Sequence, residues 1–213
     1  NMIAEKLPKK ISVFPLSNAI FFPKTILPLN IFEKRYISLV SDCMKNNKLF
    51  GMTQPIEKSI PKPQVYKIGC LGKITSFAET NDKRFIINLS GVIRFKIIKE
   101  LTTDKLYREF EVDYSDFFED LAFQEKDIKK HNIYNLLQKV KSLFDRNNYY
   151  INFEELEKLN FDQLISTICM ISPFSVEEKQ KLIEAISIED KIETLDKIIN
   201  LNLLENLDTK IVN

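Results

Sequence analysis

The stretch RFIINLSGVIRFKIIKE, residues 84–100, decides the fold of this chain, because apolar and β-branched residues dominate it over the length of a long strand. Gly91 interrupts the run, and a glycine inside a strand pattern predicts a bulge or a sharp bend. A second apolar run covers residues 65–77, and polar residues 79–84 separate the two. Asn81 and Asp82 suit the turn of a hairpin, so the two runs predict long strands joined by a polar loop.

Further strands are predicted around this hairpin. Residues 11–16 and 26–30 are short, rich in β-favouring residues and punctuated by proline, as edge strands and barrel corners often are. Residues 108–114 alternate, with Phe110, Val112 and Tyr114 on one face. Residues 54–64 carry three prolines and are predicted to form a loop. One helix interrupts the β region, because apolar residues recur there at helical spacing: Tyr36, Leu39, Val40, Cys43 and Met44.

The second half of the chain is predicted to form a small helical bundle. Apolar residues recur at helical spacing in two stretches: Ile133, Leu136, Leu137, Val140, Leu143 and Phe144, and then Ile188, Ile192, Leu195, Ile199 and Leu203. Three helix starts carry N-cap signatures: Asn152 with Glu155, Ser175 with Glu178, and Ser187 with Asp190. In each, a side-chain oxygen can accept from a first-turn N–H, and the acidic residue favours the positive end of the helix.

Composition narrows the chemistry that this chain can perform. It has 213 residues, with only four glycines, one histidine and three cysteines. Phosphate-cradling loops need glycine and H-E-x-x-H zinc helices need two histidines, so nucleotide-driven motors, dehydrogenases and most metalloenzymes are disfavoured. Cys43, Cys70 and Cys169 are far apart in the sequence, which fits neither a disulfide framework nor a zinc site. We expect free thiols and a cytoplasmic location.

No motif nominates a catalytic, cofactor-binding or metal-binding residue. Gly69 to Lys73 resembles the end of a P-loop, but the first glycine of that motif would fall on Lys67, and Ile74 follows the lysine in place of Ser or Thr. A Ser–Lys dyad stays open on composition alone, although no motif selects one. The longest uncharged run near the start, residues 11–23, has 13 residues, whereas a membrane-spanning helix needs about 20. We expect no enzyme activity, no cofactor and no membrane partner.

The charges separate into a basic half and an acidic half. Residues 1–118 carry 19 basic and 12 acidic side chains, a net charge of +7, while residues 119–213 carry 12 and 18, a net charge of −6. This split predicts a β domain over residues 1–118 and a helical domain over residues 119–213. The alternative is charge drift on two solvated faces. Only five of the 31 basic residues are Arg, which weakens a nucleic-acid interpretation, because Arg supplies the bidentate fork that reads phosphate and guanine.

An ordered series of motifs runs through the chain. These are ISVFPL (11–16), AIFFP (19–23), ILPLNIFEKRY (26–36), LFG (49–51), YKIGCLGKI (66–74) and FIINLSGVIRF (85–95). Together they resemble the N-terminal domain of the ATP-dependent protease Lon, and residues 178–184 and 187–195 look like the helical part of that domain. The resemblance covers nearly the whole chain. One departure is Asp82-Lys83, where the family usually has Asp-Gly, and it affects only a turn.

The resemblance implies an α+β fold, namely a PUA-like six-stranded β pseudo-barrel with one inserted helix, followed by a small α-helical bundle. It also implies a non-catalytic module that recognises unfolded or client polypeptides, since ATP hydrolysis and peptide cleavage belong to separate domains that no part of this chain resembles. Full-length Lon is a further candidate partner, with this chain as adaptor or competitor. The identity of the bound proteins and the oligomeric state stay open.

Two neighbouring segments are our candidates for binding polypeptide: Phe21, Phe22 and Pro23, and the helix start Phe32, Glu33, Lys34, Arg35 and Tyr36. Exposed apolar surface would hold unfolded segments, with charges at the rim. Phe21 and Phe22 are adjacent, so in an extended segment they point to opposite faces and one is expected to be exposed. The alternative is that both are buried and that Glu33 and Arg35 only organise the helix start.

A second hypothesis is a PUA-like RNA-binding module. It rests on the basic first half, in which Tyr and Phe are interspersed among lysines. The acidic second half, the few arginines and the lack of an RNA-binding motif in the sequence count against it.

Overall fold

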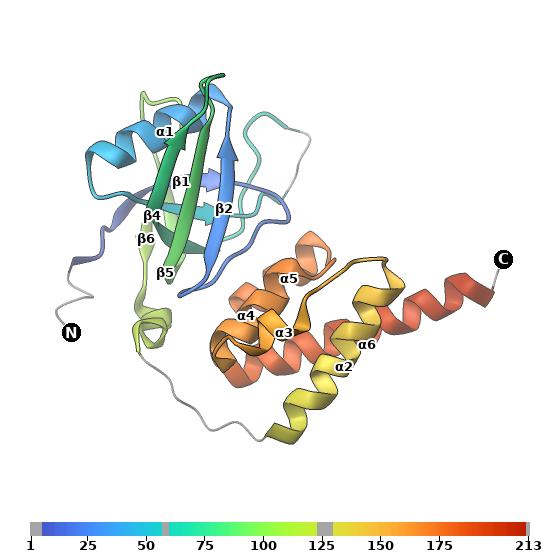
Figure 1. Cartoon of the computed structure of the whole chain (residues 1–213). Coiled ribbons are helices and arrows are strands. Elements are labelled where there is room, and N and C mark those ends of the chain that lie inside the picture. Colours follow the sequence, from blue (N-terminus) through green and yellow to red (C-terminus); the bar gives the residue numbers. More distant parts are fainter. Residues whose placement is uncertain (1–5, 57–59, 123–129, 212–213) are drawn as a thin grey trace. The chain divides into compact units, whose positions relative to one another are not determined.

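The computed structural model describes residues 6–56, 60–122 and 130–211. The chain divides into two compact units, Asn1–Ala122 and Phe123–Asn213. The first carries the strands and the second carries a set of helices (Figure 1). The boundary differs from the expected one after residue 118, because the 3-10 helix η2 (Ser115–Leu121) belongs to the first unit. Within η2, Phe117 is buried in the barrel core and Asp120 pairs with Arg94 of a barrel strand.

A six-stranded mixed sheet forms the first unit, as predicted for the α+β fold. Its strands are β1 (Lys10–Pro15), β2 (Ile26–Ile31), β3 (Leu49–Thr53), β4 (Ile68–Glu79), β5 (Phe85–Leu101) and β6 (Arg108–Asp113). They lie in the order β2-β5-β4-β3-β1-β6, and β5 also pairs with β6. The last pairing closes five strands into a ring and leaves β2 outside it. β1 and β3 pair in parallel, and the other pairs are antiparallel.

Strand β5 is long enough to pair with two strands along the same edge. Residues 85–90 pair with β2, and residues 96–101 pair with β6. The register against β4 shifts beside Gly91, as the glycine predicts. The segment that leads into β2 passes directly over this point, since a Cβ on Gly91 would lie 1.9 Å from the carbonyl oxygen of Phe22. Backbone hydrogen bonds fix the crossing: Lys24 N donates to Gly91 O, and Gly91 N donates to Thr25 O.

Helix α1 (Lys34–Lys45) packs one face against the barrel. Its predicted apolar side is observed, with Tyr36, Leu39, Val40 and Cys43 buried. The Tyr36 ring lies 3.8 Å from the Phe14 ring of β1, measured between centroids. Asp42 accepts a 2.7 Å hydrogen bond from the Tyr107 hydroxyl, so α1 is also tied to the chain just before β6.

The second unit contains α2 (Lys130–Arg146), α3 (Phe153–Glu157), α4 (Phe161–Ile171), α5 (Val176–Glu184) and α6 (Ile188–Ile211). The three predicted caps are confirmed: Asn152 accepts from Glu155 N, Ser175 from Glu178 N in a full capping box, and Ser187 from Asp190 N. A fourth, Asn160 at the start of α4, was not predicted. The apolar stripes of α2 and α6 contribute Leu136, Val140, Leu143, Leu195 and Ile199 to the buried set.

Candidate functional site

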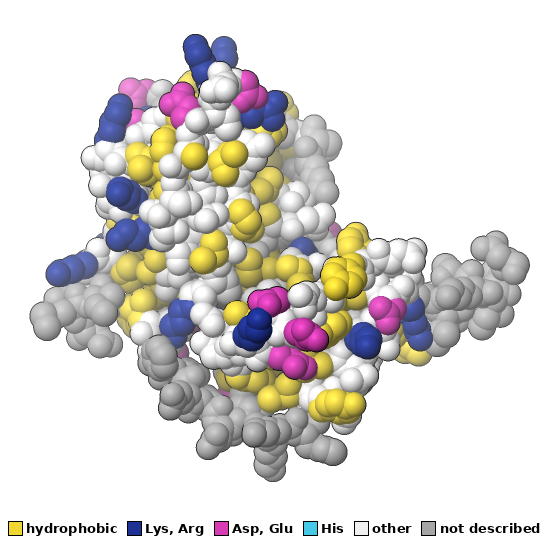
Figure 2. Space-filling model, in the orientation of Figure 1, with side chains coloured by type: hydrophobic (Ala, Val, Ile, Leu, Met, Phe, Trp, Pro, Cys, Tyr) yellow, Lys and Arg dark blue, Asp and Glu magenta, His cyan; other side chains and the backbone are white. Residues whose placement is uncertain are grey.

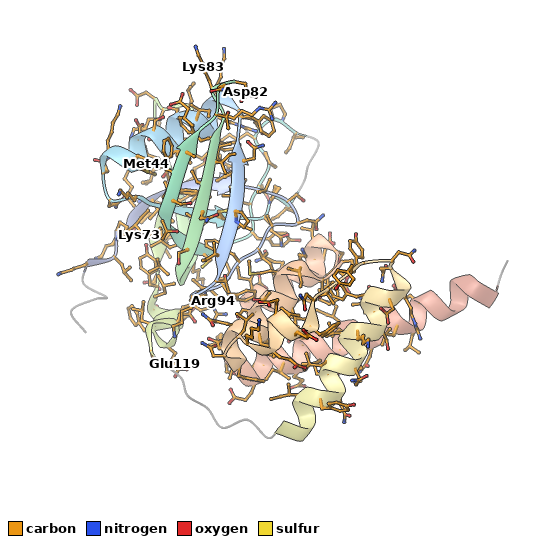
Figure 3. All side chains as sticks on the ribbon, viewed as in Figure 1. Met44, Lys73, Asp82, Lys83, Arg94 and Glu119 are labelled. Carbon is orange, nitrogen blue, oxygen red and sulfur yellow. The ribbon has the colours of Figure 1, made fainter. Side chains whose placement is uncertain are left out.

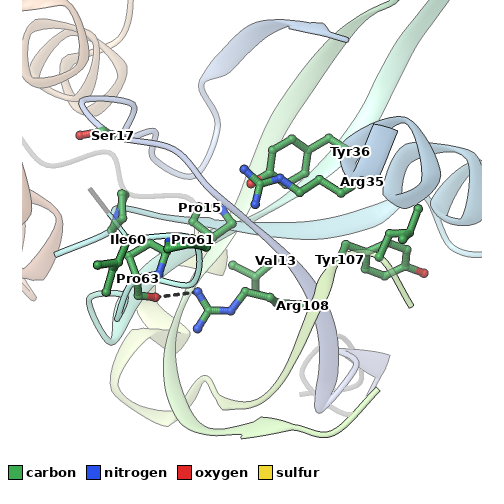
Figure 4. A pocket seen from close by; sticks show the side chains of 12 residues that line it. Val13, Pro15, Ser17, Arg35, Tyr36, Ile60, Pro61, Pro63, Tyr107 and Arg108 are labelled. Carbon is green, nitrogen blue, oxygen red and sulfur yellow. Dashed lines mark hydrogen bonds between the residues drawn. The ribbon is translucent and has the colours of Figure 1, made fainter. Parts of the chain in front are cut away.

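A hollow of about 310 Å³ opens on the first unit where four parts of the chain meet (Figure 4). Its lining comes from β1 and the residue that soon follows it (Val13, Pro15, Ser17), from the start of α1 (Arg35, Tyr36), from the loop between β3 and β4 (Pro55, Ile60, Pro61, Pro63), and from the start of β6 with the residues before it (Leu106, Tyr107, Arg108). We call this hollow the proline groove, because four prolines line it.

The groove combines a buried floor with exposed apolar side chains at its mouth. Tyr36 and Tyr107 are 6% and 4% exposed, and Val13 is fully buried. Leu106 and Ile60, in contrast, are 67% and 44% exposed. Largely apolar hollows with a few polar groups are typical of ligand sites, and exposed apolar side chains at the rim gain contacts when a ligand covers them. The groove is therefore suited to an apolar side chain.

Arg108 holds the wall of the groove in place. Its Nε and Nη2 atoms donate to the two carboxylate oxygens of Glu100, each at 2.9 Å, and its Nη1 donates to the carbonyl of Pro63 at 2.8 Å (Figure 4). The hydrogen bonds from Arg108 lower the pKa of Glu100, and Lys62 at 3.1 Å acts in the same direction. One arginine thus ties the proline loop to β5 and β6, which pre-forms the hollow.

The two tyrosines of the floor keep their protons. Burial raises the pKa of Tyr36, and the neighbouring Arg35, whose guanidinium lies 4.7 Å from the ring centroid, opposes this shift. Burial and the hydrogen bond to Asp42 raise the pKa of Tyr107. Both rings therefore act as neutral, rigid surfaces, which is what packing against an apolar ligand requires.

Only some of the candidates at the helix start line the groove. Arg35 and Tyr36 line the groove, and Glu33 pairs with Arg35 at 3.0 Å. Lys34 is exposed. Phe32 is 62% exposed but is not part of the groove lining; its ring lies 5.6 Å from the guanidinium of Arg84, which borders the loop between β4 and β5. Figure 3 labels Asp82 and Lys83 at the tip of that hairpin.

The structure corrects the prediction for the other candidate segment, residues 21–23. Phe21 and Phe22 are both 0% exposed and Pro23 is buried, so the expectation that one ring is exposed is wrong. The segment turns instead of running as a strand: Lys24 has a φ of 62°, and the Thr25 hydroxyl donates to Phe22 O. Neighbouring rings of a turn need not face opposite sides, and here both enter the core. A Cβ on Gly72 would lie 2.8 Å from the Phe21 ring, so Gly72 makes room for it.

A second exposed surface covers the outer side of β2, β5 and β4. Ile26 and Ile86 are 59% and 49% exposed there, and cross-strand register places them with four further exposed residues, Pro28, Asn30, Ser76 and Ala78. None of these six carries a charge, and we call them the uncharged sheet face. In Figure 2 the side of the first unit that faces the viewer is mostly apolar or neutral, with charged side chains towards its margins.

Sequence reasoning missed most of the groove. Ile60, Pro61, Leu106 and Arg108 lie in or beside loops, where no periodic pattern selects them. The only local signal was the group of three prolines at residues 54–64.

A Ser–Lys pair does occur in the second unit. Lys191 Nζ donates to Ser166 Oγ at 3.3 Å, and the Asp162 carboxylate lies 3.7 Å from the same lysine. Ser166 is 1% exposed, so its hydroxyl is out of reach of a substrate. Over residues 6–56, 60–122 and 130–211, no group of three His, Cys, Asp or Glu side chains is placed to hold a metal ion. In the same residues no helix is both long and apolar enough to span a membrane.

A six-stranded barrel that carries an apolar groove, followed by a helical unit, places the chain in the class of α+β binding domains. The model of the family described as the ATP-dependent protease La (LON) substrate-binding domain matches residues 10–200. The chain belongs to this family.

Relatives in both sequence and structure agree with this assignment. The chain is 24% identical to a Lon protease of Dictyoglomus thermophilum over 195 residues, covering 89% of this chain, and 25% identical to one of Syntrophus aciditrophicus over 220 residues. It spans about a quarter of the length of these relatives. The fold is similar to a Lon N-terminal domain protein from Xanthomonas campestris (TM-score 0.58, 19% identity, 88% of this chain and 97% of the other). The N-terminal domain of a Mycobacterium avium complex Lon protease gives a TM-score of 0.62 at 13% identity, over 90% and 98% of the two chains.

Proposed function

We propose that this chain is a non-catalytic module that holds unfolded polypeptide segments, and that the proline groove is where it holds them. The observation that carries the proposal is the groove itself, in a member of a substrate-binding family. Exposed Leu106 and Ile60 stand beside a rigid floor of Tyr36 and Tyr107. Native proteins bury most of their large apolar side chains, so a hollow that takes one such side chain favours unfolded chains.

The energetics fit a weak, general binder. Full burial of one Leu- or Phe-sized side chain stabilises a complex by about 1.5–3 kcal/mol. Part of this is offset by the ordering of the bound segment. One groove therefore holds a chain briefly, and it selects for accessible apolar residues.

The test is fluorescence anisotropy with labelled α-lactalbumin, either native or permanently unfolded by reduction and carboxymethylation. We expect binding of the unfolded form only. Leu106→Ser should weaken it about tenfold, because the most exposed apolar side chain of the rim is lost. Ile86→Ser, a matched change on the uncharged sheet face, should leave it unchanged. Both side chains are exposed, so neither variant should unfold.

Equal affinity for native and unfolded protein would refute the function. A larger loss in Ile86→Ser than in Leu106→Ser would move the site to the sheet face.

A salt titration with labelled RNA tests the RNA-binding alternative. Counterion release makes nucleic-acid binding fall steeply with salt, whereas the apolar part of polypeptide binding does not. Retention of RNA at low salt with a steep salt dependence would favour the alternative.

Capture of full-length Lon from the chain's own cell extract would support a role as adaptor or competitor.

The proposal includes a cytoplasmic setting. Cys43, Cys70 and Cys169 are free and buried, which fits a reducing compartment.

A further inference from the structure

A second hollow of different chemistry lies beside the proline groove. This neighbour has a volume of about 500 Å³ and shares Arg35, Pro61, Leu106, Tyr107 and Arg108 with the groove. The remaining lining is polar for the most part and comes from Lys62 of the loop between β3 and β4, from the end of β5 and from the residues that follow β5. Because five residues line both hollows, the two lie side by side, and one ligand can contact both.

The second hollow is basic. Arg35, Lys62, Lys105 and Arg108 line it, against the single carboxylate of Glu100. Glu100 is engaged by Arg108 and Lys62, and Glu33 outside the lining pairs with Arg35. Counting both carboxylates, cations still exceed anions four to two.

Several of these cations can turn towards a ligand. The side chains of Lys62 and Arg35 are 68% and 47% exposed, and Lys105 is exposed with its Nζ 5.3 Å from the Tyr107 ring centroid. Their present pairs lie at the surface, where an ion pair is weak and easily exchanged. Arg108 differs, because three hydrogen bonds fix it as part of the wall.

We propose that the groove prefers polypeptide segments in which an apolar residue is followed or preceded closely by acidic residues. The inference rests on the proposed function and names its substrate class. The apolar side chain occupies the proline groove, and the acidic side chains lie in the basic hollow beside it. An extended chain rises about 3.3 Å per residue, so acidic residues one to three positions away reach that hollow. Complementary charge gives selectivity and faster association more than raw affinity.

The experiment uses the full chain and three labelled 11-residue peptides, each with one central Phe in a Gly/Ser background. The Phe is flanked by two Asp on each side, by Ser, or by Lys. In fluorescence anisotropy at low salt, we expect the Asp peptide to bind tightest and the Lys peptide weakest, about tenfold apart, since each exposed pair contributes a factor of about two to five. Raising the salt concentration should bring the three affinities together.

Two variants test the location. Lys62→Glu with Lys105→Glu should abolish or reverse the preference, while Lys45→Glu with Lys73→Glu, at exposed positions that line neither hollow, should keep it. Cooperative thermal unfolding should show that both variants are folded, although Lys62→Glu loses its ion pair with Glu100 and Lys45→Glu removes a cation from the last turn of α1.

The outcomes separate the inference from the function. Equal binding of all three peptides overturns the preference and leaves polypeptide binding intact. Failure of every peptide, the Ser-flanked one included, overturns both. Two further ligands lack the apolar residue: an Asp peptide without Phe, and a uridine oligomer. If either binds as tightly as the Phe-centred Asp peptide, the chain recognises negative charge alone, and the inference is overturned.

Discussion

The pairing of Arg94 with Asp120 offers the sharpest test of how the first unit is held together. Asp120 Oδ2 accepts from the backbone N and the Nε of Arg94, both at 3.0 Å, and Oδ1 accepts from Nη2 at 2.9 Å. The Arg94 side chain is 3% exposed and its guanidinium also lies 4.5 Å from the Phe117 ring centroid. Asp120→Ala removes these three hydrogen bonds from a buried cation. Breaking a buried pair in this way costs about 3–5 kcal/mol.

The loss should be measured by urea unfolding combined with hydrogen exchange of residues 92–97, which reports the barrel separately from the helical unit. Asp116→Ala is the matched control, because Asp116 is an exposed acid on the same short helix, and we expect a change within about 0.5 kcal/mol. Arg94→Met combined with Asp120→Leu should recover most of the loss, since no charge is then left buried. A loss below about 1 kcal/mol for Asp120→Ala would show that η2 does not depend on this pair.

Two further substitutions and one labelling experiment have defined outcomes. Gly91→Ala forces a Cβ to within 1.9 Å of Phe22 O, so we expect a loss of about 3 kcal/mol in urea unfolding relative to Ser90→Ala, and no loss would refute the close crossing. Hydrogen bonds from Arg108 hold the pKa of Glu100 below its ordinary 4.5, so the stability that Glu100 adds is present above pH 4.5 and is lost as the pH falls through the lowered pKa. The stability gap to Glu100→Gln should therefore close in acid, and a gap that is constant down to pH 3 would contradict this. Burial raises the pKa of Cys169 to about 12, so this thiol should stay unlabelled by Ellman's reagent until urea unfolds the chain; rapid labelling of the native protein would count against a buried thiol.

The sequence predicted those parts of the fold that local patterns encode. Alternation at residues 108–114 became β6, and the interruption at Gly91 became a register shift. Strand β3 was not picked out from its own residues, because Leu49–Thr53 is short and almost continuously buried, so it shows no alternation. Phe21 and Phe22 would face opposite sides only in an extended chain, whereas the turn at Lys24 sends both rings inward.

The groove was beyond local reasoning for a different reason. Pro15, Arg35, Pro61 and Leu106 are brought together only by closure of the barrel and by the docking of α1. The distribution of charge along the sequence predicted the two units better than it predicted the groove. The change of sign near residue 118 lies close to the division at Ala122. The four cations and two carboxylates at the two hollows are only a small part of the charges of residues 1–118.

The position of β2 outside the ring has a consequence for how the barrel opens. We expect the pairings among the other five strands to persist when β2 leaves, since among the strands that the structure describes β2 pairs only with residues 85–90 of β5. Detachment of β2 is therefore a local event, while removal of any other strand opens the closed ring of five strands. Amides of β2 are expected to exchange with solvent ahead of those in β4, and a protease that requires a pulled-out extended segment has its first access to the barrel here.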